Sequence, residues 1–454
     1  MSEAFDFIGY IMIVTLMKQH STRVAKLADY LVMIILVVVP FQGFVTVWGQ
    51  SLVGHYTLLR LWDEVLFLIL CVIIVYWLYR DQTLRRWFMG SMLVRLIAVY
   101  VGLTLLLGIV ALAKSEVSLK ALTYGVLVDL RFFVWFLAAL LVAQRSPFLA
   151  RTWPRIVLIP AAIVVIFASL QYTVLPHNFL THFGYNAHTT IAPIETINHN
   201  SKYIRAQSTL RGANPLGAYL VLVLSILGAL FFRGKRKLAC AIFGAVALFA
   251  LYASGSRSAW IGTLLSLAAL VWLQLKSYRQ RLYLGVAAAV LAVAAVGGFL
   301  LIHNNVSVQN EVLHTQAHSA IKIGSDQAHI TALKKGISDV LRQPFGDGPG
   351  TAGPASVYNR LHPARIADNY FIQIAQELGW FGLALFLTIA VLVTQELYQR
   401  IGQSRLALAL VVALVGISFV CMLSHAWTDD TLAYLWWGLA GIVVGSVVPE
   451  REKA

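Results

Sequence analysis

The sequence predicts an all-α, polytopic membrane helix bundle of about twelve transmembrane helices, with a large, partly helical loop on the outer face. Of the 454 residues, 59% are hydrophobic and only 12% are charged, whereas soluble chains carry about 25% charged residues. The mean hydropathy is +0.75. Uncharged stretches of about 18 to 22 residues, the length that crosses a bilayer core, recur along the chain. These observations exclude a soluble globule.

Apolar windows punctuated by glycine, proline and charge define twelve predicted spans. They cover residues 29–48, 63–79, 91–113, 121–143, 155–173, 213–232, 238–253, 258–275, 283–302, 370–396, 406–424 and 431–449. Clusters of lysine and arginine fall on one side, so the positive-inside rule predicts a cytoplasmic membrane protein with both termini cytoplasmic. This orientation signal also explains most of the net charge of +15, so we expect no nucleic-acid partner.

Two longer connectors, residues 174–212 and 303–369, lie on the predicted outer face and are too polar to span a membrane. Loops of this kind commonly carry function. They are also rich in histidine, as polar loops that avoid lysine can be. His314 and His318 are spaced like a metal-binding pair on a helix, but the spacing supplies no third ligand. We therefore predict neither a metal nor a cofactor.

The first segment of interest is RAQSTLRGANPLG, residues 205–217, which leads into an apolar helix. Asn214 is predicted to cap that helix and Pro215 to be its first residue. Arg211 then lies just before a helix N-terminus, where free backbone N–H groups favour an anion. The alternative is an arginine that only extends to the membrane interface.

The second segment is SGSRSAW, residues 254–260, a short polar break between two apolar runs. Its Arg257 shares the predicted outer face with Arg211. Two guanidinium groups at one depth suit a diphosphate, because each planar fork binds phosphate oxygens in a bidentate manner. The alternative is a turn between two helices whose arginine binds a lipid phosphate.

The third segment begins with QPFGDGPG, residues 343–350, which is too rich in turn residues to be helical and lacks the GK[ST] of a P-loop. In the helix that follows, Asn369, Gln373, Gln376 and Glu377 form one polar stripe. Polar groups at membrane depth normally face the bundle interior or a water-filled cavity and are functional candidates. Asp129 and Arg131 in the fourth span are weaker candidates, because residues two apart do not share a helical face.

Taken together, these segments resemble the O-antigen ligase and polymerase family of integral-membrane glycosyltransferases. The resemblance covers residues 200–400, where STLRGANPLGAYL, SGSRSAWIG, QPFGDGPG and DNYFIQIAQELGWFG occur in the order typical of the family. It implies three parts: N-terminal helices with the first outer loop (1–200), a catalytic core (201–402) that includes the outer loop 303–369, and a C-terminal helix pair (403–454).

The resemblance implies transfer of a glycan from undecaprenyl diphosphate to a glycolipid or glycan acceptor on the outer face, in the synthesis of lipopolysaccharide or another envelope polysaccharide. Arg211 and Arg257 would contact the diphosphate. The family motif is a histidine, a small polar residue, nine residues and Gly-x-x-Gly. Here Asp368 takes the place of the histidine, followed by Asn369, nine residues and Gly379-Trp-Phe-Gly382.

Asp368 is therefore expected as the catalytic group on the acceptor side. An ordinary aspartate is a weak base at neutral pH, so either partial burial raises the pKa of Asp368 or His362 takes part. The further substrate-binding candidates are Arg205, Asn214, His362, Arg365, Asn369 and Glu377. Two alternatives stay open: a polymerase of the same family, and a transporter or lipid-linked glycan binding protein that uses the same arginines without chemistry.

Overall fold

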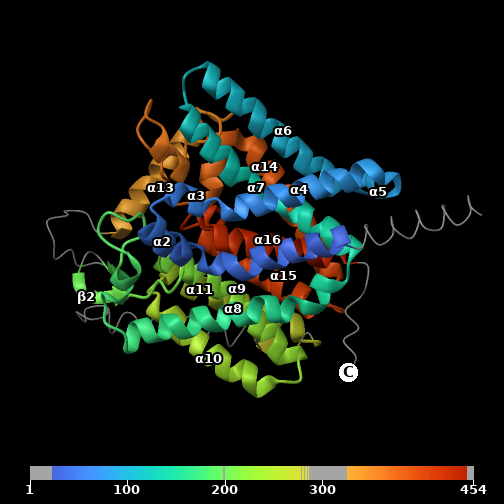
Figure 1. Ribbon diagram of the computed structural model, residues 1–454, viewed down its shortest axis with the longest axis vertical. Coiled ribbons are helices and arrows are strands. Elements are labelled where there is room, and N and C mark those ends of the chain that lie inside the picture. Colours follow the sequence, from blue (N-terminus) through green and yellow to red (C-terminus); the bar gives the residue numbers. More distant parts are fainter. Residues whose placement is uncertain are drawn as a thin grey trace, which may run out of the picture.

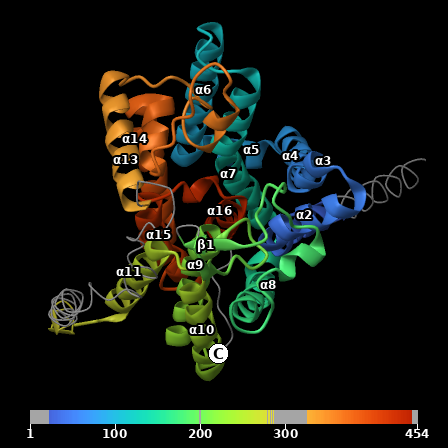
Figure 2. The same cartoon turned by 90° about the vertical axis from the view of Figure 1, so that its left-hand side faces the viewer.

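The computed structural model describes residues 23–446 except 198–199, 278, 281, 284 and 286–324. The described chain is helical apart from one small hairpin (Figures 1 and 2). From residue 23 a helical segment leads into η1 (Val39–Phe41), α2 (Gln42–Val53), α3 (Tyr56–Arg60), α4 (Trp62–Arg80), α5 (Gln82–Gly90), α6 (Met92–Ala113), α7 (Leu119–Arg145), α8 (Phe148–Thr173) and η2 (Phe179–Phe183). After the hairpin come α9 (Ala213–Arg233), α10 (Lys237–Ala253), α11 (Arg257–Gln274), α13 (Ser325–Arg342), η4 (Pro354–Tyr358), α14 (Tyr370–Gln399), α15 (Arg405–Cys421), η5 (Ala426–Thr428) and α16 (Asp430–Gly445).

The all-helical prediction is confirmed, but the count of twelve membrane spans is not. Eleven of the twelve predicted ranges coincide with helix in the described chain, and the range 283–302 lies almost entirely outside it. By length and composition, seven of the described helical stretches could cross a membrane. Three further apolar helices, α10, α15 and α16, are only 10–17 residues long. His314 and His318 lie outside the described residues.

The last helix, α16, forms the centre of the bundle and packs along α7, while α15 packs along α9 and α11 (Figure 1). Close approach of α16 to α7 depends on small residues. A Cβ atom at Gly441 would lie 2.4 Å from the carbonyl oxygen of Phe136, and one at Gly445 would lie 2.1 Å from that of Leu140. Glycine is common where membrane helices approach this closely, because packing has to replace the hydrophobic effect there.

The helices α4, α7, α9, α11, α14 and α16 begin at the end of the bundle that lies on the left in Figure 1. We call it the loop end, because both long connectors lie there. Arg60, just before α4, bonds to Asp430 at the start of α16, and Asn369 at the start of α14 bonds to the carbonyl oxygen of Met422.

The first long connector contains the hairpin, which the sequence did not predict. Strands β1 (Glu195–Ile197) and β2 (Asn200–Arg205) pair antiparallel, with Glu195 opposite Arg205. The chain then passes between α8 and α10, where the Ala206 N–H donates to the Ala253 carbonyl over 2.9 Å. The hairpin therefore leads straight into the STLRGANPLG segment and fixes its start.

The stretch QPFGDGPG is a turn, as predicted, and it fills a break in α14 that was not predicted. At Gly379 the backbone leaves the helical conformation, with φ of 69° and ψ of −174°. The N–H groups of Asp347 and Gly348 donate to the carbonyl groups of Gln376 and Glu377, over 2.9 and 2.8 Å. The Trp380 N–H donates to the Pro344 carbonyl over 3.0 Å. The turn thus satisfies backbone groups that the break would leave unpaired inside the bundle.

Replacing Gly379 with alanine should destabilise the protein by about 1–3 kcal/mol, the usual cost of a strained backbone conformation. The positive φ disfavours any side chain, and the new Cβ would lie 2.4 Å from the Pro344 carbonyl oxygen. Thermal unfolding of the detergent-solubilised protein measures the effect. Gly402→Ala is the matched control, because a Cβ there meets no atom within 4 Å. Equal melting temperatures for the two variants would contradict a structural need for glycine at 379.

Candidate functional site

Arg211 lies two residues before α9, at the loop end, but the helix starts differently from the prediction. The cap residue is Gly212, not Asn214, and Pro215 is the third helical residue. Glu195 on β1 takes over the capping role, because its Oε2 accepts a hydrogen bond of 3.0 Å from the Ala213 N–H. The Asn214 side chain instead accepts a 2.5 Å hydrogen bond from the guanidinium of Arg205.

Arg257 is the first residue of α11, and its helix start packs against that of α9. A Cβ at Gly217 in α9 would lie 2.7 Å from the Cβ of Ser256. Arg205 lies between them, with its Nε donating to the Ser254 carbonyl over 2.8 Å. Burial lowers the pKa of Arg205, and the neighbouring Arg257 guanidinium lowers it further against the opposing effect of Glu195. Three arginines therefore concentrate positive charge around two helix N-termini.

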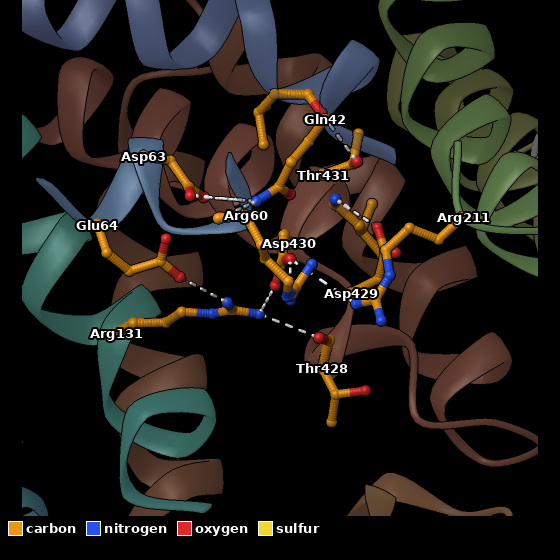
Figure 3. Close-up of polar contacts among 12 residues, drawn as sticks. Gln42, Arg60, Asp63, Glu64, Arg131, Arg211, Thr428, Asp429, Asp430 and Thr431 are labelled. Carbon is orange, nitrogen blue, oxygen red and sulfur yellow. Dashed lines mark hydrogen bonds and ion pairs between the residues drawn. The ribbon is translucent and has the colours of Figure 1, made fainter. Parts of the chain in front are cut away.

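Asp430, the first residue of α16, is fully buried and contacts three guanidinium groups (Figure 3). Its Oδ2 lies 2.6 Å from Nη2 of Arg60 and 3.8 Å from Nη1 of Arg211. Its Oδ1 contacts Nη2 of Arg131. We call Arg60, Arg131, Arg211 and Asp430 the Asp430 cluster. It joins α3, α7, the segment before α9 and α16 at one point.

The sequence did not identify Arg60, Arg131 or Asp430 as members of one cluster. Arg131 and Asp129 do lie on different faces of α7, as expected, yet both are buried. Arg131 donates to the Thr428 carbonyl over 3.0 Å and lies 3.7 Å from Glu64. A charged residue inside a membrane span was the available signal, but its partner is about 300 positions away in the chain.

Asp368 contacts His329, and its electrostatics differ from the prediction. Oδ2 of Asp368 lies 2.8 Å from Nδ1 of His329 on α13. This hydrogen bond lowers the pKa of Asp368 and outweighs the opposing effect of partial burial, so the expected upward shift is wrong. His362 does not join this pair: its Nε2 lies 3.3 Å from Glu116, and both side chains are about half exposed.

Asn369 caps α14, with its Oδ1 accepting from the Ile372 N–H over 3.0 Å. Its Nδ2 donates to the Met422 carbonyl over 2.9 Å and so ties α14 to the connector 422–429. This connector also holds His425, which is close enough to Asp368 for each to influence the charge of the other. The Cα atoms of His425 and Asp430 are at most about 18 Å apart, because only five residues separate them. One short connector therefore runs from Asp368 to the Asp430 cluster.

Arg365 and Glu377 have structural partners. Arg365 Nε donates to Asp339 over 3.2 Å, and its Nη1 contacts Asp347 in the turn. Glu377 accepts a 2.8 Å hydrogen bond from the Gly350 N–H. Gln373, Gln376 and Glu377 are buried, as the polar stripe predicts. The hydrogen bonds of Glu377 to Gly350 and of Gln376 to Asp339 on α13 hold the second connector against α14.

A pocket of about 390 Å³ lies between α13 and residues 364–367, the segment just before α14. Lys335, Asp339, Arg365 and Gln376 supply its polar groups. Figure 2 shows α13 and α14 side by side at the loop end.

Replacing Asp430 with alanine should destabilise the fold by about 3–5 kcal/mol, because breaking a buried ion pair leaves charge without compensation. The Asp430 carboxylate forms ion pairs with three guanidinium groups, so its loss leaves all three less compensated. Unfolding of the purified protein in detergent, followed by intrinsic fluorescence, measures the change. In the control Glu396→Ala, the lost i,i+4 pair with Arg400 is partly exposed, so the change should stay below about 1 kcal/mol. Wild-type stability for Asp430→Ala would show that the cluster does not hold the helices together.

Two comparisons find known proteins that are similar to parts of this chain. The O-antigen ligase family model matches residues 242–387, a range that contains Arg257, Asp368 and the Gly379–Gly382 motif but not Arg211. An O-antigen polymerase of Salmonella muenchen is 26% identical over 210 residues. The match covers 46% of this chain and 51% of the polymerase, so the chain spans about half the length of that relative. The chain therefore has several helical stretches that could cross a membrane, and its residues 242–387 are similar to the O-antigen ligase family.

Proposed function

We propose that the protein is a glycosyltransferase that moves a glycan from undecaprenyl diphosphate to an acceptor hydroxyl at the loop end. The observation that carries this proposal is the pair of packed helix starts that hold Arg211 and Arg257, the second of them inside the O-antigen ligase domain. We further propose that the loop end faces away from the cytoplasm and that both chain termini are cytoplasmic, as the distribution of basic residues predicts.

The leaving group of this reaction is a lipid-borne diphosphate, and its developing charge needs stabilisation. The starts of α9 and α11 direct positive dipole ends toward the site. At α9 the Ala213 N–H is used by Glu195, so the guanidinium groups supply the main donors there. Arg211 and Arg257 add guanidinium groups, which stay charged and bind phosphate oxygens in a planar fork. Charges fixed in place before the reaction stabilise the transition state without reorganisation. Arg205 donates hydrogen bonds to Asn214 in α9 and to Ser254 just before α11, and would thereby hold the two helix starts together.

Asp430 suits the task of holding Arg211 in position. The 3.8 Å between them is an ion-pair distance and too long for a hydrogen bond. The Asp430 carboxylate therefore orients the Arg211 guanidinium by charge and does not use its N–H donors. Arg211 is also the most exposed of the three arginines, with 27% of its side chain accessible against 15% for Arg60 and 2% for Arg131.

The acceptor would approach from the start of α14, where Asp368 and Asn369 lie next to the connector 422–429. The acceptor oxygen attacks the anomeric carbon, the bond from that carbon to the phosphate oxygen breaks, and undecaprenyl diphosphate leaves. The hydroxyl proton has to pass to a base on the acceptor side.

A ligase that transfers the glycan to a glycolipid is our first assignment, following the family model. Two observations favour a polymerase as the second candidate. The curated relative is an O-antigen polymerase, and aspartate occupies position 368, where the ligase motif has histidine.

Arg211→Ala and Arg257→Ala should each reduce transfer by about 10²–10³-fold, the usual effect of losing one charge-stabilising donor. Lysine at either position should restore part of the rate, because it keeps the charge but not the fork. The assay measures release of undecaprenyl diphosphate by the purified full-length protein, supplied with an undecaprenyl-diphosphate-linked glycan and an acceptor.

Arg85→Ala is the matched control, because Arg85 is an exposed arginine on α5, at the opposite end of the bundle. Full activity in both loop-end variants would contradict the proposal. Tight binding of the donor without any release by the wild type would instead identify a binding protein.

A deletion strain separates the two enzyme types. For a ligase, we expect the loss of all surface glycan attachment, because no other step joins glycan to acceptor. For a polymerase, single repeat units should remain attached while longer chains disappear. Electrophoresis of extracted surface glycolipids, with complementation by the intact gene as control, distinguishes the two outcomes.

A further inference from the structure

Asp368 does not act alone at the start of α14, because its carboxylate binds a histidine from another helix. We propose that His329 accepts the proton of the acceptor hydroxyl and that Asp368 positions His329 for this step. The inference rests on the proposed function and identifies the base that the reaction needs.

The geometry of the pair fixes the roles of the two ring nitrogens. Nδ1 of His329 lies 2.8 Å from Oδ2 of Asp368, a hydrogen-bond distance. An ionised carboxylate can only accept, so Nδ1 carries the hydrogen and Nε2 carries the lone pair of the neutral ring. The same arrangement orients the base in carboxylate–histidine pairs of hydrolases. The side chain of His329 is 48% exposed, so an acceptor at the protein surface can reach it.

The packing of α13 presents His329 to Asp368. Gly336 lies two helical turns after His329 on the same face, and a Cβ there would lie 2.7 Å from the Cβ of Ala367. Asp339, one turn further, accepts hydrogen bonds from Arg365 and from Gln376 on α14. These contacts hold α13 against the residues that flank Asp368.

The backbone at Asp368 also restricts what can stand there. Its φ is +50°, in the left-handed region. Among residues with a side chain, asparagine, aspartate and histidine are the ones enriched in that region. The aspartate here and the histidine of the family motif therefore suit the same backbone. In this chain the imidazole comes from α13 and the carboxylate from the start of α14.

Two histidines face Asp368: His329 from α13 and His425 from the connector 422–429. Burial lowers the pKa of His425 to about 4, against the opposing effect of Asp368. His425 is therefore neutral at pH 7. The imidazolium that forms when His329 takes the proton is the cation that Asp368 stabilises.

The atoms balance without a further reactant. The acceptor oxygen forms a bond to the anomeric carbon as its proton moves to Nε2 of His329. The bond from the anomeric carbon to the phosphate oxygen breaks, and undecaprenyl diphosphate leaves with the electron pair. Release of the proton to water returns His329 to its neutral form.

The first test replaces each member of the pair in the full-length protein. His329→Gln and Asp368→Asn should each reduce the release of undecaprenyl diphosphate by about 10²–10⁴-fold, with the larger loss for His329. The controls are His182→Gln, an exposed histidine on η2, and Glu116→Gln, which removes the carboxylate of the other histidine–carboxylate pair at this end. Both controls should keep wild-type activity.

The pH profile tests the positioning role of Asp368. An amide stabilises the imidazolium less than a carboxylate does, so the acid limb for Asp368→Asn should move down by about 1 pH unit. A purely structural role for Asp368 would lower the rate at every pH and leave the limb unmoved, which would overturn the positioning role.

The double variant Asp368→His with His329→Ala supplies the decisive comparison. It returns an imidazole to the family position on a backbone that tolerates histidine. Activity at least 10-fold above that of His329→Ala alone would support a missing base and exclude a folding defect. Unchanged activity for His329→Gln, with Arg211→Ala inactive, would overturn this inference and leave the proposed function intact. Absence of turnover in the wild type would instead overturn the proposed function.

Discussion

The buried carboxylate of Asp430 is the contact on which the arrangement of the loop end depends. It binds Arg60 from α3, Arg131 from the interior of α7 and Arg211 from the segment before α9. These residues belong to parts of the chain that are far apart in sequence, and Asp430 belongs to the last helix. A buried charge of this kind is costly unless it is fully paired. The helices must therefore assemble together, with α16 in the centre, before the charges are satisfied.

The same last helix connects the two halves of the proposed site. The connector 422–429 reaches α14 at one end, through Asn369, and enters α16 at the other, through Asp430. Membrane helices gain little from the hydrophobic effect between one another, so polar contacts and close packing of small residues determine their relative positions. Both occur on α16, which combines Gly441 and Gly445 against α7 with the Asp430 cluster at its start. One helix, α16, thus helps to fix both the arginines proposed to bind the donor and the residues on the proposed acceptor side.

Local features of the sequence were sufficient to predict the long apolar helices, the turn at residues 343–350 and the buried polar stripe on α14, but not α5 or α13. Composition, glycine and proline content and the helical period are all readable within a short window. Features that depend on distant residues were not predictable. Glu195 moves the start of α9 from Asn214 back to Gly212, although it lies 18 positions before Ala213. The Arg60–Asp430 contact joins residues 370 positions apart. The break at Gly379 lies within an apolar helix and was not predictable from that helix alone, because the turn that satisfies its backbone groups comes from the preceding connector.

Position 368 combines a left-handed backbone with a carboxylate that binds a histidine. The Gly379 break and its turn hold the first half of α14 in place, and Asn369 caps the helix directly after Asp368. The left-handed backbone at 368 accepts few residue types, and these include a base and a carboxylate. Here the carboxylate occupies it, and the proposed base, His329, comes from α13 and lies at hydrogen-bond distance. In the proposed reaction the second connector supplies the proton acceptor, and the fold of this connector depends on the contacts of Arg365, Asp339 and Glu377.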